Sequence, residues 1–160
     1  MARTYAVTFE NVAVSAAQDL FEIKGASGKM LEIIGFKIGA TDTTIPTAQM
    51  LQIRGRFMPA TVTSGSGGSS PTPAKTDPGD ASASFTAGAN NTSKATTSGT
   101  AIVQYENGVH IFNGEDVAFD GVQFPRPVVG PSESWVLELL STVSGTVHMS
   151  ASIWVRETGG

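Results

Sequence analysis

The chain of 160 residues contains no cysteine, so neither disulfide bonds nor thiolate metal sites contribute to its structure. Charged residues are also scarce, at 15% of the sequence against the usual ~25%. The 14 acidic residues outnumber the 10 basic ones, which gives a net charge of -4. Without runs of Lys and Arg to neutralise phosphates, the chain is not expected to bind nucleic acid directly.

Long apolar runs are absent as well. No stretch of the sequence approaches the ~18 consecutive apolar residues of a membrane-spanning helix, so no membrane partner is expected. The first ten residues alternate in polarity and include Glu10, and they lack the apolar run and cleavage site of a signal peptide. We therefore expect a protein that is made in a cytosol and stays there, or that leaves by lysis or within a particle.

Glycine, proline and β-branched residues are abundant instead. Eighteen glycines and eight prolines interrupt the chain at short intervals. Between these interruptions, apolar and polar residues alternate with a period of two, which is typical of strands with one buried face. The expected strands span residues 4–10, 19–24, 30–39, 49–57, 101–106, 109–112, 117–124, 134–140 and 146–156.

This pattern predicts an all-β chain without helices. Residues 1–160 are expected to form a single antiparallel β-sandwich or jelly roll, because a double sheet buries so many apolar faces. Residues 30–39 are apolar on both faces and therefore indicate a central strand covered on each side. Trp135 shares the apolar side of residues 134–140 and is expected in the core.

Turn signals and one unusual segment complete the predicted fold. Asn107-Gly108 and Asn113-Gly114 predict tight turns, and Gly145 predicts the end of a hairpin between the last two strands. Residues 61–100 are rich in Ser, Gly, Thr, Ala and Pro, with Phe85 as the one large apolar side chain. They are expected to form a long insertion loop between strong strands.

No group of side chains marks a catalytic centre. His110 and His148 are well separated and do not supply the cluster of histidines that a metal site needs. No G-x-S-x-G motif is present, and Asp77-Pro78-Gly79-Asp80 is more typical of a β-turn than of a calcium site. We expect no enzyme activity and no cofactor. Exposed strand charges are the preferred interpretation of the glutamates Glu22, Glu32, Glu106, Glu133 and Glu138.

Four residues are candidates for an interface. Trp154 lies on the otherwise polar face of the last predicted strand, together with His148 and Arg156, and Phe112 points to a similar outward face. Large aromatic side chains on a wet face often mark a contact with another protein. The alternative stays open that both faces of this sheet are covered within one subunit.

Several segments resemble structural proteins of tailed-phage virions. The resemblance begins with residues 20–24 (LFEIK) and 29–39 (KMLEIIGFKIG), which flank a Gly/Ser turn. It continues in Pro71-Thr72-Pro73, Asp77-Pro78-Gly79-Asp80, Pro125-Arg126-Pro127-Val128-Val129 and Arg156-Glu157-Thr158-Gly159-Gly160.

The closest functional analogy is with capsid decoration (cement) proteins of jelly-roll fold. The resemblance implies a homo-oligomer, a trimer, that sits on the capsid exterior of a virion and bridges subunits of the major capsid protein. Such proteins have no catalytic residues to carry over. A departure is the short segment before the first strand, residues 1–3, which leaves loops, strand edges or residues 61–100 to grip the shell. A receptor- or glycan-binding head of a phage fibre and a self-assembling coat protein are the alternatives.

Overall fold

The computed structural model describes residues 2–159, in which thirteen β-strands and no helix occur. The strands are β1 (Arg3–Val14), β2 (Gln18–Lys24), β3 (Met30–Ala40), β4 (Met50–Met58), β5 (Val62–Thr63), β6 (Ala74–Lys75), β7 (Thr86–Asn91), β8 (Thr96–Thr97), β9 (Ile102–His110), β10 (Glu115–Ala118), β11 (Val128–Val129), β12 (Ser134–Leu139) and β13 (Val147–Thr158).

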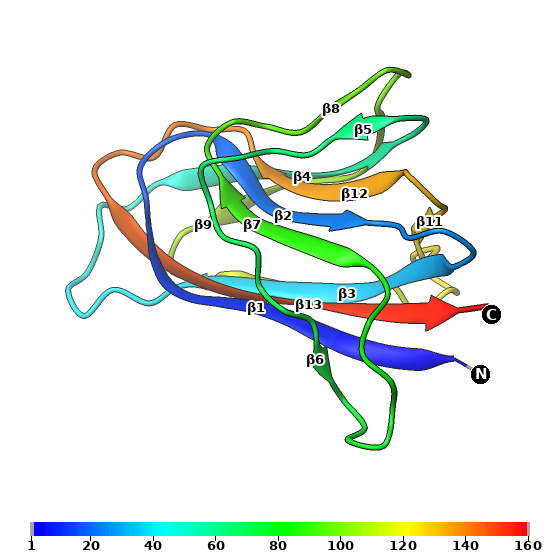
Figure 1. Cartoon of the computed structure of the whole chain (residues 1–160). Helices are drawn as coiled ribbons and strands as arrows, with labels where there is room; N and C mark the ends of the chain where they lie inside the picture. Colours follow the sequence, from blue (N-terminus) through cyan, green and yellow to red (C-terminus); the bar gives the residue numbers. More distant parts are fainter. Residues whose placement is uncertain (1, 160) are drawn as a thin grey trace.

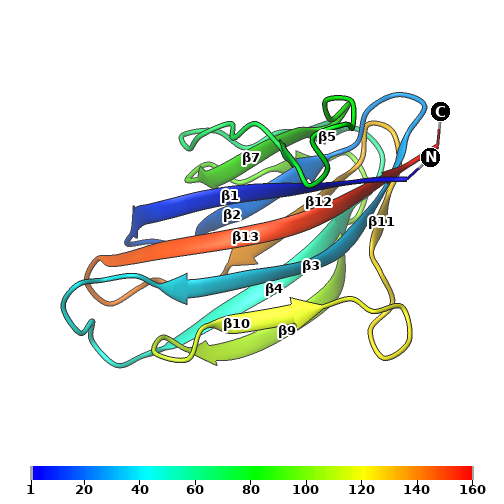
Figure 2. The same ribbon diagram turned by 90° about the horizontal axis from the view of Figure 1, so that it is seen from below.

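Two antiparallel sheets pack face to face (Figures 1 and 2). Sheet A has the order β10-β3-β13-β1-β6, and β11 also pairs with β3. Sheet B has the order β7-β2-β12-β4-β9. Since Arg3 on β1 pairs with Glu157 on β13, both ends of the chain leave the sandwich side by side (Figure 1). The expected all-β antiparallel sandwich is confirmed.

Strict alternation builds the core between the sheets. Along β13, buried and half-buried residues alternate over the whole strand, as the sequence predicts. Its inward side chains are those of Val147, Met149, Ala151, Ile153 and Val155. From sheet B, the expected inward residues of β12 are fully buried as well, and they are Trp135, Leu137 and Leu139.

Trp135 lies in an aromatic cluster within this core. Its ring centroid lies 6.3 Å from that of Phe36 and 6.2 Å from that of Phe119. The edge of the indole lies against Gly55 on the neighbouring strand β4, where a larger residue would have no room. Aromatic pairs at these separations add to the free energy of burial, so this cluster fixes the spacing of the two sheets at one point.

The expected long insertion loop at 61–100 is not confirmed. Residues 59–66 and 93–101, here named the covering segment, contain the paired strands β5 and β8 and lie over sheet B on the side away from sheet A (Figure 1). They form a second small core against the outer face of sheet B. Its members are Met58, Val62, Ala95, Val136 and the partly buried Ala101.

The middle of the same stretch serves as an edge for both sheets. β6 pairs with β1 at the edge of sheet A, and residues 77–80 form the expected β-turn, with the Asp80 amide donating to the Asp77 carbonyl. Phe85 then enters the core, where its ring contacts Tyr5 edge-on at 5.6 Å. Next, β7 pairs with β2 at the edge of sheet B. The buried side chains of this strand are only alanines and asparagines, which is why its composition suggested a loop.

Two of the expected turns are wrong. Asn107 and Gly108 lie inside β9, because the strand pairs with β4 along nearly its whole length and Gly108 is the partner of Gln52. Gly145 does not close a hairpin, since it lies between β12 of sheet B and β13 of sheet A. The turn at Asn113-Gly114 does occur and joins β9 to β10, with Gly114 at a φ of 65°.

Replacing Gly55 with Ala should destabilise the fold. A Cβ atom at this position would lie 2.4 Å from Cζ2 of the buried Trp135 ring. Overpacking of a core costs about 1–3 kcal/mol of unfolding free energy, which urea denaturation measures. The matched control is Gly39→Ala, where the added Cβ meets no atom within 4 Å. Equal stability of the two variants would contradict the close packing of Trp135 on β4.

Candidate binding face and groove

The outer faces of the two sheets differ in how they are covered. The covering segment lies over sheet B, whereas the strands of sheet A lie in front of the rest of the molecule in Figure 2. Strand β3 is internal to sheet A, but it is not covered on both sides as expected, and Met30 stays 44% exposed. We name the outer face of sheet A the binding face. Its middle strand β13 contributes the half-buried residues His148, Ser150, Ser152, Trp154 and Arg156.

Trp154 lies near the middle of the sheet. Its partner across β1 is Ala6 and its partner across β3 is Gly35, so small residues flank it on both sides. A large aromatic ring among small neighbours projects above the sheet and remains partly exposed. Such a residue is a suitable anchor for another surface.

Arg156, two residues further along β13, takes part in a group of charges. Its Nη1 lies 3.5 Å from Oε2 of Glu32 on β3, and Nη1 of Arg126 lies 3.5 Å from the same oxygen. All three side chains are partly exposed, so the ion pairs contribute little to stability. Two arginines for one carboxylate leave this end of the binding face positively charged.

His148 lies at the other end of β13 and contacts Asp42. Both carboxylate oxygens of Asp42 accept a hydrogen bond from the His148 backbone amide, at 3.1 and 3.0 Å, and Nδ1 lies 2.9 Å from Oδ1. The hydrogen bond to the His148 side chain is the main reason why the pKa of Asp42 is lowered. His148 is thus engaged within the chain, whereas His110 stacks edge-on against Phe112 at 5.0 Å.

Phe112 lies in the turn between β9 and β10 and is 52% exposed. It lines a hollow together with Asp42, so it belongs to the same end of the molecule as His148. Trp154 lies six residues from His148 along β13, a separation of roughly 20 Å. The four predicted interface residues therefore do not lie together: Trp154 and Arg156 lie in one part of the binding face, and His148 and Phe112 lie at the end that holds the β9–β10 turn.

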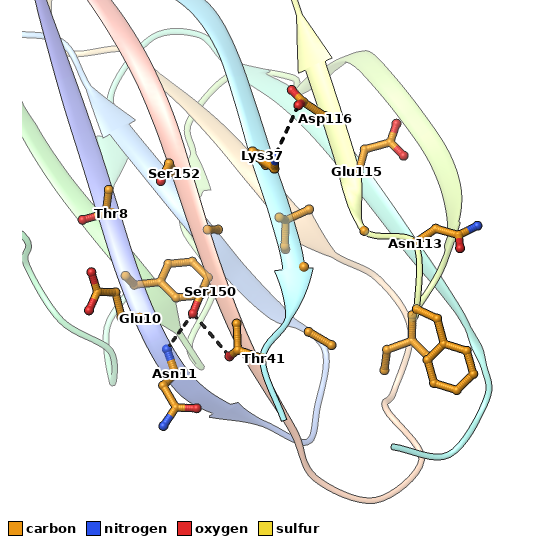
Figure 3. A pocket seen from close by; sticks show the side chains of 18 of the residues that line it. Thr8, Glu10, Asn11, Lys37, Thr41, Asn113, Glu115, Asp116, Ser150 and Ser152 are labelled. Carbon is orange, nitrogen blue, oxygen red and sulfur yellow. Dashed lines mark hydrogen bonds and ion pairs between the residues drawn. The ribbon is translucent and has the colours of Figure 1, made fainter. Parts of the chain in front are cut away.

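A groove of about 910 Å³ occupies the end that holds Phe112 (Figure 3). Glu10 and Asn11 of β1 lie on one side of it, and Asn113 and the first residues of β10 lie on the other. The floor consists of β13 and β3, and its residues are Lys37, Gly39, Ser150 and Ser152. The groove is open to solvent, and no motif in the sequence indicates it, since its lining comes from four separate strands.

Charge in the groove is mainly negative. The residues Glu10, Glu115 and Asp116 line it together with one cation, Lys37, whose Nζ lies 3.6 Å from Asp116. Glu115 accepts hydrogen bonds from Asn107 at 2.9 Å and from the hydroxyl group of Tyr105, which fix its position. The groove therefore favours neutral or positively charged groups over anions.

The densest group of charged side chains lies beneath the covering segment instead. Glu138 on β12 is only 3% exposed and accepts hydrogen bonds from Arg54 at 2.8 Å and from Lys94. Arg56 adds a second guanidinium group, with Nε 2.9 Å from Oε2 of Glu138. Because Lys94 belongs to the covering segment and Arg54 to β4, this ion network joins the segment to sheet B.

Backbone amides of the covering segment also bind carboxylates on β2. The Ala95 amide donates to Oδ2 of Asp19 at 2.7 Å, and the Gly65 amide donates to Oε2 of Glu22 at 3.0 Å. Asp19 is fully buried and Glu22 is 2% exposed. A buried carboxylate without donors is costly, so these contacts hold the covering segment in place.

Two buried carboxylates of the network, Asp19 and Glu138, have pKa values shifted in opposite directions. Burial raises the pKa of Asp19 to about 6, although the hydrogen bond from Ala95 acts against this shift. Burial also acts to raise the pKa of Glu138, but hydrogen bonds from Lys94 and Arg54 and the charge of Arg56 lower it overall. Both carboxyl groups are closed off from solvent, and we assign the network a structural role.

The expectation that Glu22 and Glu138 are exposed strand charges is wrong, because both lie beneath the covering segment. One signal was present. Val136 shares the outer side of β12 with Glu138, and a large apolar residue there indicates that something covers that side. The donors on the covering segment had no comparable signal, since two of the three contacts use backbone amides.

No family model matches the chain, and neither a curated protein nor a solved structure matches it. No helix within residues 2–159 has the length and apolarity needed to cross a membrane. Within the same residues, no three His, Asp or Glu side chains gather as a metal site requires. The fold and the site define an antiparallel β-sandwich with one outer face closed by its own chain and one outer face bare.

Asp19 should make the fold less stable as the pH rises. With a pKa of about 6 in the folded protein and an ordinary value of 3.8, its stabilising contribution is complete below pH 3.8 and is lost as the pH rises through about 6. Asp19→Asn keeps an oxygen for the Ala95 amide but does not titrate. Urea denaturation at several pH values should show that the unfolding free energy of the wild type falls between pH 3.8 and about 6 relative to that of Asp19→Asn. The difference should change by up to about 1.4 kcal/mol per pH unit.

Glu138 should show the opposite trend. Its lowered pKa gives stability that is present above pH 4.5 and is lost as the pH falls through the folded value. Glu138→Gln leaves three cations around a neutral amide and should cost about 3–5 kcal/mol at neutral pH. The exposed Glu106→Gln serves as the control and should have little effect. Similar stabilities for both variants would contradict the role of the network.

Proposed function

We propose that the protein is a non-enzymatic structural component of a viral particle, a capsid decoration protein on the capsid exterior. Three copies associate, and each copy bridges neighbouring subunits of the major capsid protein. The observation that carries this proposal is the difference between the two outer faces. The covering segment closes sheet B, while the binding face stays bare with Trp154 on its middle strand.

Exposed apolar side chains support the assignment at the end where the termini lie. Val128 on β11 pairs with Glu32 on β3, which lies two residues from Met30. Val122 and Phe124 lie in the loop that precedes β11. Their exposed fractions range from 44% to 92%. We name these four residues the apolar strip. Exposed large apolar side chains are typical of surfaces that a partner covers.

The proposed arrangement gives each part of the surface a separate role. Trp154, Arg156 and the apolar strip contact other copies of the chain or the shell. The covering segment, whose outward residues are mainly Ser, Thr and Gly, faces solvent, since its few apolar side chains already pack on sheet B. Three linked copies engage the shell together, so weak single contacts add up to tight attachment.

Light scattering of the purified protein should give a mass near three times 16.6 kDa. Trp154→Glu should reduce the mass to that of a monomer, because a carboxylate at an apolar contact would be desolvated without a partner. The matched control is Gln104→Glu, which adds the same charge to the exposed outer side of β9 and should leave the mass unchanged.

Co-sedimentation with assembled capsid shells of the virus encoded by the same genome tests the second half of the proposal. Wild-type protein should sediment with the shells, and Trp154→Glu should remain in the supernatant. A monomeric wild-type protein would contradict self-assembly, and an unchanged trimer of Trp154→Glu would contradict the assignment of the binding face. A trimer that does not sediment with the shells would contradict the decoration function but not self-assembly.

A further inference from the structure

The groove at the Phe112 end of the binding face has the dimensions of a ligand site. Its volume of about 910 Å³ lies within the range of ~300–1,000 Å³ that is usual for such sites. It is open to solvent and its lining crosses the face from β1 over β13 and β3 to β10 (Figure 3), so it admits a chain molecule more readily than a compact one. Ser152 on its floor lies two residues from Trp154 along β13, roughly 7 Å. The groove therefore ends beside Trp154, which does not itself line it.

A β-bulge builds one wall of the groove. The register between β1 and β13 shifts between Phe9 and Val12, and Asn11 within the bulge has a φ of 50°. The Asn11 amide donates to Oγ of Ser150 at 2.9 Å, and the Ser150 hydroxyl donates to Oγ1 of Thr41 at 3.3 Å (Figure 3). Bulges turn side chains into new directions, and here the hydrogen bonds keep Glu10 and Asn11 at the rim.

Hydrogen-bonding groups line the groove on all sides. Hydroxyl groups come from Thr8 and Ser152, an amide from Asn113, and carboxylates from Glu10 and Asp116. These groups can donate to or accept from the hydroxyl groups of a ligand, and the carboxylates form the stronger, charge-assisted bonds. The excess of carboxylates over the single Lys37 repels phosphate, sulfate and uronate groups, so a ligand of this groove is not an anion.

Phe112 adds an apolar surface beside these polar groups. It lines both the groove and a second hollow of about 240 Å³, in which the 88% exposed Ile45 also takes part. An exposed aromatic face next to hydroxyl-binding groups matches a ligand with one apolar and one polar side. A pyranose ring has this character, since its C–H groups form one face and its hydroxyl groups point outward.

We infer that this groove binds a neutral oligosaccharide. Glu10, Asn11, Ser152 and Asp116 hydrogen-bond the hydroxyl groups, and Phe112 packs against the face of one sugar ring. Gly39 on the floor leaves space for the ligand, since a Cβ atom there would meet nothing within 4 Å. Its backbone is free of positive φ, so a larger residue can occupy the position without strain.

Amide chemical shifts of the ¹⁵N-labelled full chain test the inference. Maltohexaose, cellohexaose and chitohexaose serve as neutral probes, and an oligogalacturonate of equal length serves as the anionic control. At least one neutral probe should cause saturable shifts at Asn11, Gly39 and Ser152, and the oligogalacturonate should cause none. The inference is overturned if no neutral probe shifts these amides, or if the anionic probe shifts them equally.

Variants then separate groove binding from other effects. Gly39→Leu should fill the floor and weaken binding at least tenfold, whereas Ala118→Leu adds the same side chain outside the groove and should not. Asp116→Asn removes a charged acceptor on an exposed side chain and should weaken binding about tenfold without affecting the fold. Unchanged affinity in both groove variants would contradict the inference.

Trp154→Glu distinguishes this inference from the proposed function. Trp154 does not line the groove, so this variant should bind the sugar as the wild type does, even as a monomer. Loss of assembly with sugar binding retained would support both assignments. Loss of sugar binding in Trp154→Glu, with the fold intact, would show that the ligand site includes the contact between copies. It would contradict the inference that the groove of a single chain is sufficient for binding.

Discussion

Buried charge on the outer face of sheet B is the constraint on which the rest of the structure depends. Asp19, Glu22 and Glu138 lie under a covering layer and need donors, because an ionised carboxylate without partners is unstable in such a place. Two arginines of β4 meet part of this need. The other donors are Lys94 and backbone amides of a segment with few large apolar side chains. Charge thus orders a part of the chain that apolar burial alone would leave loose.

The ordering of this segment shapes the whole surface. Between its two halves, the chain supplies β6 to the edge of sheet A and β7 to the edge of sheet B, so both sheets are completed along the same side. The outer face of sheet B is closed as a result, and sheet A keeps the bare face. The binding face divides further into a part with Trp154 and two arginines and a part with the acidic groove.

The sequence predicted those elements whose burial follows a simple period. Alternation in β12 and β13 revealed Trp135 as core and Trp154 as outward, because the residues that face the other sheet recur at every second position. Composition gave a wrong prediction for residues 61–100. It reflects the apolar content of a segment, but not the hydrogen bonds between backbone amides and carboxylates that hold this one in place. Turn propensity wrongly predicted a turn at Asn107-Gly108, because both residues pair with β4 as part of a continuous strand. The groove could not be predicted, because its walls come from strands about 100 residues apart and meet only through the sheet order.

The pairing of Arg3 with Glu157 determines how the protein responds to mechanical load. Tension applied between the two ends pulls β1 and β13 apart sideways, along the direction of their hydrogen bonds, since ladder bonds in an antiparallel pair run perpendicular to the strands. The hydrogen bonds then break one after another, because the force acts on one bond at a time and is not distributed over the ladder. Attached to a carrier through both ends, this sandwich would open at low force from the termini inward, and the groove end would be the last to separate.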